Sequence, residues 1–159
     1  MKKLTGSFRY TQWDPWLVIS QILCVQCLLY LSLGLILALL GTLVGDSRTL
    51  DHIFEYHEIQ VRDAGGRVVI TAFVINALVG AVVLWYIVER TKQCMDFSCT
   101  WHLIHLVTCW FYNSQFPVTF SWWMLNVACA TIMCVCAEFL CLRTELAAIP
   151  LSLGPKTDL

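Results

Sequence analysis

Long uncharged stretches separated by short charged segments dominate this chain. Residues 16–44 and 68–88 carry no charged side chain, and each stretch is long enough for one helix across a bilayer, which takes about 20 apolar residues. Residues 97–137 are also uncharged but too long for one crossing, and Asn113-Ser114-Gln115-Phe116-Pro117 interrupts them. A proline among polar residues marks a tight turn between two antiparallel helices. The pattern therefore predicts an all-α membrane protein, a four-helix transmembrane bundle with spans at about 16–44, 68–88, 97–112 and 118–141.

The composition indicates that these helices are surrounded mainly by lipid. Hydrophobic residues make up 58% of the 159 positions and charged residues 13%, about half the charged fraction of a typical soluble domain. Such a chain has too little polar surface to cover a globule in water, so we expect one membrane domain over residues 1–159. The net charge of −1 gives no reason to expect nucleic acid as a partner.

The basic residues predict the orientation of the bundle, because lysine and arginine near span ends are retained on the cytosolic side. Seven basic residues lie in the amino-terminal segment, the second connection and the carboxyl tail: Lys2, Lys3, Arg9, Arg90, Lys92, Arg143 and Lys156. The first connection, residues 45–67, holds three arginines against five acidic residues. We therefore expect both termini, including the tail 142–159, on the cytosolic side and residues 45–67 on the luminal side.

The luminal loop has a pattern of its own. Four of its residues repeat at helical spacing: Leu50, Ile53, Phe54 and His57. This spacing predicts a short helix lying at the membrane interface. The segment that follows alternates loosely around Ala64-Gly65-Gly66 and suggests a hairpin.

Small residues recur every four positions on two of the predicted spans. They are Gly34 with Ala38, Gly41 with Gly45, and Ala72 with Asn76 and Gly80. In lipid, such faces let helix backbones approach closely, so they predict a packed bundle.

Ionisable residues inside the predicted spans are candidates for function, because a polar group in hydrocarbon is costly unless a partner satisfies it. There are three of them: His102, His105 and Glu138. A small channel or transporter would use them, whereas in a structural role the histidines would hydrogen-bond between helices and Glu138 would reach the headgroup layer. The same interhelical role is expected of four amide side chains: Gln21, Gln26, Asn76 and Asn126.

Both histidines belong to a stripe of soft ligands on the third span: Cys99, His102, His105 and Cys109. The stripe invites a zinc site, but ten steps of 1.5 Å spread it over about 15 Å, so one ion would contact only an adjacent pair. An intramembrane metal-dependent enzyme is therefore a second rival interpretation. The sequence carries no GxSxG, phosphate-loop or HExxH motif, and we expect no catalytic residue, no cofactor and no bound metal.

The nine cysteines mostly fall inside the apolar stretches. A secreted chain would use them for disulfides, but here they are expected to pack as small apolar side chains. Cys94 and Cys141 lie at the edges of the stretches, where S-palmitoylation is the alternative.

Ordered motifs run through nearly the whole chain. They are Trp13-Asp14-Pro15, Ser32-Leu33-Gly34-Leu35, Lys92-Gln93-Cys94, Asp96-Phe97, His102, His105, Cys109-Trp110-Phe111-Tyr112, Ser114, Phe116-Pro117, Trp122-Trp123, Glu138, Leu140-Cys141, Arg143-Thr144-Glu145-Leu146 and Ile149-Pro150-Leu151. On these residues the chain resembles the Sys family of small Golgi membrane proteins. The resemblance implies a trans-Golgi receptor that recruits an Arf-related small GTPase with an acetylated amino terminus, and so supports golgin recruitment and vesicle trafficking.

Such a GTPase would reach only the cytosolic elements of the chain and the adjacent headgroup layer. Charged side chains at an interface steer association and set register, so we expect a composite dock there. Its candidate partner-binding residues are Trp13, Asp14, Arg90, Lys92, Arg143 and Glu145. The alternative is that these charges only set topology and hold lipid headgroups. A groove between helices would admit the amphipathic amino-terminal segment of the partner.

Overall fold

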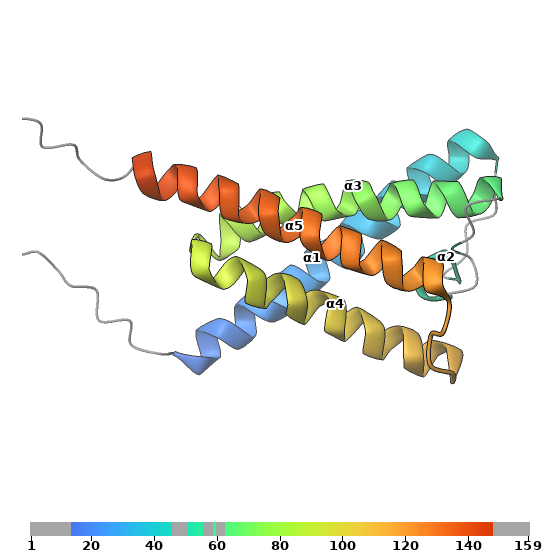
Figure 1. The fold of residues 1–159 in the computed structure, drawn as a ribbon, viewed down its shortest axis with the longest axis horizontal. Helices are drawn as coiled ribbons and strands as arrows, with labels where there is room; N and C mark the ends of the chain where they lie inside the picture. The colour runs from blue at the N-terminus through green and yellow to red at the C-terminus, as the bar shows by residue number, and fades with distance from the viewer. Residues whose placement is uncertain (1–13, 46–50, 56–58, 60–62, 148–159) are drawn as a thin grey trace, which may run out of the picture.

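The computed structural model describes residues 14–45, 51–55, 59 and 63–147. Within these ranges the chain forms four long helices and one short helix (Figure 1). Their bounds are α1 (Pro15–Val44), α2 (Asp51–Phe54), α3 (Ala64–Ile87), α4 (Thr91–Asn113) and α5 (Phe120–Ala147). The prediction of an all-helical fold is thereby confirmed.

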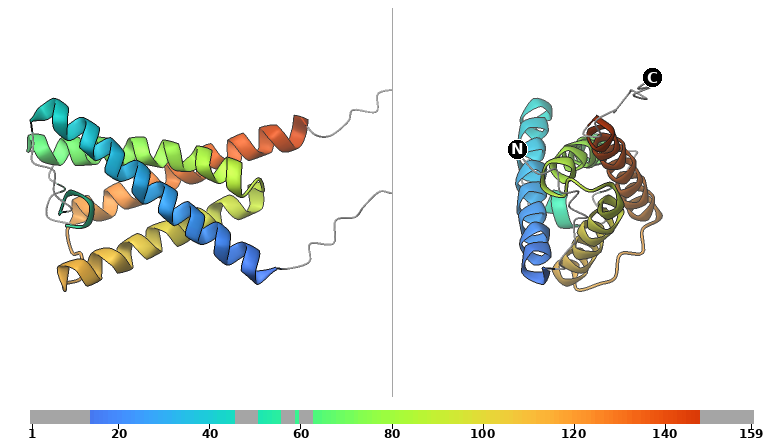
Figure 2. Two further views of the ribbon diagram at one scale, coloured as in Figure 1. Left: turned by 180° about the vertical axis from the view of Figure 1, so that it is seen from behind. Right: turned by 90° about the vertical axis from the view of Figure 1, so that its left-hand side faces the viewer.

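The long helices run up and down beside one another and leave two distinct ends (Figures 1 and 2). One end, here called the tail end, holds the start of α1, the connection between α3 and α4, and the end of α5. The other, the loop end, holds the end of α1, the short α2, the start of α3 and the turn into α5. α4 and α5 are antiparallel neighbours, as the proline-containing turn predicts. α1 crosses the others obliquely (Figure 2).

Three of the four long helices are individually long and apolar enough to cross a membrane. These are α1, α3 and α5. α4 is not among them, because Lys92, Asp96 and two histidines lower its hydropathy. The structure therefore supports three of the four predicted spans by length and composition.

The ends of α1 follow from local chemistry. Asp14 precedes the helix with an extended backbone, and its Oδ1 accepts a hydrogen bond of 3.1 Å from the Trp16 amide. Pro15 begins the helix at a position where a missing N–H costs nothing. Gly45 ends it with a φ of 74°, a left-handed conformation that glycine adopts without strain.

The start of α3 corrects the sequence prediction. Ala64-Gly65-Gly66 form its first turn rather than a hairpin. Asp63 stands before the helix with an extended backbone, and its carbonyl accepts from the Arg67 amide at 3.2 Å. Gly66 is buried against the bundle, so tertiary packing outweighs the low helix propensity of two glycines.

The short helix α2 packs inward on the bundle. The Phe54 ring lies 5.8 Å from that of Tyr30 and 5.4 Å from that of Tyr112. The Asn113 side chain donates to the Phe54 carbonyl at 2.7 Å, which ties α2 to the end of α4. The predicted helix is thus a single turn, and its interfacial position stays a prediction. Leu50 and His57, from the same pattern, lie outside the described residues.

α3 packs most closely through its small-residue face. Ala72, Asn76 and Gly80 are all buried, as their spacing predicts. A Cβ on Gly80 would overlap Sδ of Met133 and come within 3.2 Å of Cδ2 of Leu29, so α1, α3 and α5 meet at this residue. Gly34 is different, because a Cβ there would meet nothing within 4 Å. The close approach predicted at Gly34 is therefore wrong within this chain, where Gly34 is half-buried beside open space.

Candidate functional site

The tail end is joined by contacts between residues far apart in the sequence. Oε1 of Glu145, on the last turns of α5, accepts from the Thr91 amide at the start of α4 at 3.1 Å. A carboxylate at that position satisfies an orphan N–H and opposes the positive end of the helix dipole. The Gln21 side chain of α1 donates to the Ile87 carbonyl at the end of α3, at 3.1 Å. A bond from Trp85 of α3 to Thr144 of α5 links these two pairs of helices, so parts of all four long helices form one surface.

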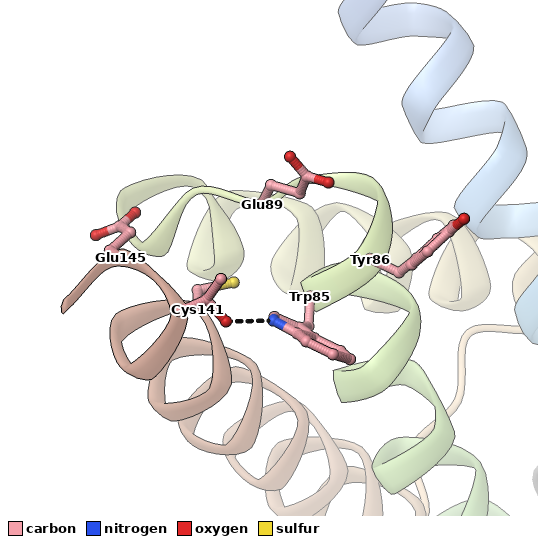
Figure 3. Close-up of a pocket in the computed structure, with 6 residues that line it drawn as sticks. Trp85, Tyr86, Glu89, Cys141 and Glu145 are labelled. Atoms are coloured by element: carbon pink, nitrogen blue, oxygen red, sulfur yellow. Dashed lines mark hydrogen bonds between the residues drawn. The ribbon is translucent and has the colours of Figure 1, made fainter. Parts of the chain in front are cut away.

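The same end holds a pocket of about 290 Å³ between the last turns of α3 and α5 (Figure 3). We call it the tail-end pocket, and its lining residues are Trp85, Tyr86, Glu89, Cys141, Thr144 and Glu145. The Trp85 indole donates to Thr144 Oγ1 at 2.8 Å, which holds the ring against α5. Figure 3 shows Trp85 beside Cys141, with Glu89 on the turn that follows α3, Glu145 near the end of α5, and Tyr86 directed away from α5.

Glu89 has a left-handed backbone, with a φ of 54°. Such a conformation costs a non-glycine residue about 1 kcal/mol or more and persists where the surroundings impose it. Here it lets the chain turn from α3 into α4 within three residues, Val88 to Arg90. The sharp turn places the Glu89 side chain over the pocket.

The structure brings some of the predicted dock residues together and separates others. Arg90 and Lys92 flank Thr91, and so lie beside Glu145. Arg143 is two positions from Glu145 on α5, about 200° around the helix, and therefore projects from the opposite side. Asp14 caps α1 at the same end of the bundle, and Trp13 lies outside the described residues. Their role in binding a partner stays a prediction.

His105 lies at the centre of the bundle in a cluster of rings. Its side chain is 0% exposed. Nδ1 is hydrogen-bonded to the Tyr30 hydroxyl of α1 at 3.3 Å, and Nε2 lies 3.5 Å from Sγ of Cys109. Its ring stacks on Trp101, with centroids 5.4 Å apart, and on Trp122, with centroids 6.4 Å apart. These contacts are those of a packing residue between helices.

The other two ionisable residues of the predicted spans, His102 and Glu138, differ in how many of their polar atoms have hydrogen-bond partners. Nδ1 of His102 donates to the Ser98 carbonyl at 2.9 Å, while its buried Nε2 has no partner among the residues described. Glu138 is half-buried and accepts from Cys134 Sγ at 3.5 Å. Neither residue is joined to His105 by a hydrogen bond among the described residues.

Of the four amides, two bond between helices as predicted. Gln21 reaches Ile87, and Asn76 accepts from the Ser32 hydroxyl of α1. Asn126 instead donates to the Trp122 carbonyl of its own helix, at 2.9 Å. The prediction of an interhelical hydrogen bond is therefore wrong for Asn126. Oε1 of Gln26 is buried and has no hydrogen-bond partner among the described residues.

The predicted ligand stripe on α4 does not converge. His105 and Cys109 face the core, whereas Cys99 is exposed. Within the described residues, no group of three or more histidine, cysteine or acidic side chains is placed to hold a metal ion. The structure thus offers the zinc interpretation no ligand set.

Cys94 and Cys141 lie against each other beneath the tail-end pocket. Their Sγ atoms are 3.5 Å apart, and both residues are at most 1% exposed. Four of the nine cysteines are buried, in agreement with a packing role, whereas Cys24, Cys27 and Cys99 are exposed. Palmitoylation stays a prediction, and it would require these thiols to become accessible.

Comparisons with known proteins place the chain in a family. The profile of the SYS1 family, described as "Integral membrane protein S linking to the trans Golgi network", matches residues 8–151. The chain belongs to the SYS1 family. The resemblance inferred from its motifs is confirmed.

SYS1-family relatives match over most of this chain. A protein SYS1 homolog of Nematostella vectensis is 43% identical over 151 residues, which cover 95% of this chain and 96% of the relative. One of Dictyostelium discoideum is 45% identical over 95% of this chain and 65% of its own length. Protein SYS1 of Saccharomyces cerevisiae is 25% identical over 79% of this chain and 62% of its own. No solved structure matches.

Sequence reasoning missed part of the site of this SYS1-family chain. It names Glu145 as a dock residue, but not the bond from Thr91 to its carboxylate. It does not single out Trp85, Thr144 or Glu89 for the site. The one signal is that the densest motif, Arg143-Thr144-Glu145-Leu146, lies directly after a span.

Glu145→Ala is expected to remove the hydrogen bond to the Thr91 amide and so to destabilise the first turn of α4. Loss of a helix cap costs about 1 kcal/mol, so amide hydrogen exchange of residues 91–94 should become about fivefold faster. Glu145→Gln, which keeps an acceptor for the Thr91 amide, should restore most of the protection. Equal exchange in the alanine variant and the native chain would contradict the cap.

Proposed function

We propose that this chain is a non-enzymatic receptor of the Golgi membrane that recruits an Arf-related small GTPase to the trans-Golgi. Recruitment would then support golgin binding and vesicle trafficking. SYS1-family membership supports the membrane setting, and the family description supports the link to the trans-Golgi network. The GTPase is the partner that the motif resemblance implies.

The single observation that carries the proposal is the joined surface at the tail end. Three hydrogen bonds fix segments of all four long helices against one another: Thr91 to Glu145 joins α4 to α5, Gln21 to Ile87 joins α1 to α3, and Trp85 to Thr144 joins α3 to α5. A receptor needs such a surface in fixed register, because a partner that contacts several short segments binds tightly only if they are ordered beforehand. A catalytic function would require a different arrangement of groups.

The proposal requires that the tail end face the cytosol. The start of α1 and the end of α5 lie on one side of the membrane if α4, the predicted span at 97–112, crosses it together with α1, α3 and α5. α4 has 23 residues, about 34 Å of helix, enough for a hydrocarbon core of about 30 Å. It lies alongside the three apolar spans, and its polar side chains are accommodated inward, as at His105 and Ser98. The excess of basic residues at this end supports the cytosolic orientation.

The tail-end charges would act in two ways on an approaching GTPase. Arg90, Lys92 and Arg143 would steer its association and select its orientation. An amphipathic amino-terminal segment of the GTPase would then lie along the bundle end, in the helix-in-groove mode. Because Arg143 projects from the far side of α5, the GTPase would contact more than one side of that helix.

Reversal of two charges tests the dock. Arg90→Glu combined with Arg143→Glu should abolish recruitment of the GTPase to Golgi membranes in cells, while the receptor stays in the Golgi. The matched control is Arg67→Glu, the same charge change at the exposed start of α3 on the loop end. Recruitment should survive that change. Normal recruitment by the double variant would refute the dock, and the two single variants show which side of α5 the partner uses.

A further inference from the structure

We propose that the tail-end pocket binds the ammonium headgroup of a membrane phospholipid. The pocket lies where two membrane-crossing helices, α3 and α5, reach their ends, which is the depth of lipid headgroups. Its volume of about 290 Å³ accommodates an ethanolamine group. The inference goes beyond the recruitment of a GTPase and concerns the lipid side of the same end.

The electrostatics of the pocket select a cation. Two acidic residues line it, Glu89 on the turn after α3 and Glu145 near the end of α5 (Figure 3). α3 and α5 both end here, and each helix carboxyl end carries about half a negative charge. The opposing positive end of α4 is already engaged by Oε1 of Glu145. The basic residues that would attract a phosphate do not line the pocket: Arg90 and Lys92 flank Thr91 at the start of α4, and Arg143 projects from the other side of α5.

The aromatic wall of the pocket adds to this selectivity. The Trp85 ring is fixed by its bond to Thr144 and is 37% exposed. A cation over the face of an indole is attracted by the ring quadrupole. A primary ammonium also offers three hydrogen-bond donors, which suit the two carboxylates. A headgroup that bears a primary amine therefore matches the pocket better than an anionic one.

An apolar track leads from the pocket into the membrane. Ile75, Leu78 and Val82 are exposed on α3 by 38%, 49% and 51%. Their spacing continues to Trp85 and places all four on one face of the helix. The occupant is therefore expected to be an amphiphile, with its charged head between α3 and α5 and its acyl chain along this face. A membrane phospholipid has that shape.

Native mass spectrometry of the full chain tests the assignment. The chain is extracted from bilayers with equal amounts of dioleoyl phosphatidylethanolamine and dioleoyl phosphatidylglycerol, which differ only in their headgroups. The native chain should retain the ethanolamine lipid in about tenfold excess, a difference of the size that one charge-assisted contact produces. Glu89→Gln combined with Glu145→Gln should reduce the excess to near unity. Asp96→Asn, at an exposed acidic residue of α4, is the matched control and should keep it.

The variants are chosen so that a loss of lipid is not a loss of fold. Glu145→Gln keeps an acceptor for the Thr91 amide, and Glu89→Gln alone leaves that cap untouched. Equal retention of both lipids, preference for phosphatidylglycerol, or an excess that survives the double variant would each overturn the proposal. So would unchanged lipid retention with lost GTPase recruitment, since the pocket would then serve the protein partner. Lost retention with normal recruitment supports the lipid site and leaves the receptor function intact.

Discussion

Replacing His105 with alanine should lower the free energy of unfolding by about 3 kcal/mol, because it leaves a cavity where a fully buried ring now packs. The Tyr30 hydroxyl would lose its hydrogen bond to the His105 ring at the same time. The change can be measured by unfolding in mixed detergent micelles, followed by tryptophan fluorescence. Trp101 stacks on His105 and provides a local probe of the loss.

The control for this experiment is Leu103→Ala on the same helix. Leu103 is 61% exposed, and removal of a lipid-facing side chain should change stability by no more than about 0.5 kcal/mol. If His105→Ala kept native stability but lost an ion or proton flux in reconstituted vesicles, the packing role would be refuted and the transporter interpretation revived. If His105→Ala kept native stability and neither this variant nor the native chain carried a flux, the packing role would be refuted and the transporter interpretation would gain no support.

Gly80→Leu should have the second large effect, and it tests the junction of α1, α3 and α5. A side chain there would run into Met133 and Leu29. Overpacking of a close interface costs about 1–3 kcal/mol, and more where the backbone must move. We expect a lower unfolding temperature in detergent and a broadened peak in size-exclusion chromatography.

Gly34→Leu is the matched control, since it introduces the same side chain into a membrane-crossing helix. A Cβ at Gly34 would meet nothing within 4 Å, so this variant should unfold at the native temperature. Similar behaviour of the two variants would show that the bundle does not close at Gly80. A defect confined to Gly34→Leu would indicate that the lipid-facing side of α1 is itself an interface.

The sequence predicted those parts of the fold that depend on local patterns. The uncharged stretches correspond to the long helices, with α1 at Pro15–Val44 against the predicted 16–44. The turn at Pro117 separates α4 from α5, as a residue without an N–H should. The largest differences are at α4, which begins at Thr91 against the predicted 97, and at α5, which ends at Ala147 against the predicted 141, because both helices continue through charged residues at the tail end. α3 begins at Ala64 against the predicted 68, because Gly65 and Gly66 are held in a helix by packing that no local propensity reveals.

The candidate site was less predictable because it depends on residues distant in the sequence. The bond between Trp85 and Thr144 joins residues 59 positions apart, and a single sequence carries no signal for such a pair. Hydropathy also could not separate His102 from His105. Both occur on one helix, yet only His105 turns fully into the core. A difference of three positions rotates a side chain by about 60°, which is enough to move it from a groove to the centre of the bundle.

The cap on α4 has a consequence for how the protein is made. The Thr91 amide relies on a carboxylate that the ribosome adds 54 residues later. During synthesis, the first turn of α4 therefore lacks this hydrogen bond until α5 has been made and has entered the bilayer. A premature stop codon before residue 145 would deprive the third long segment of its cap, although every residue of that segment had been translated correctly.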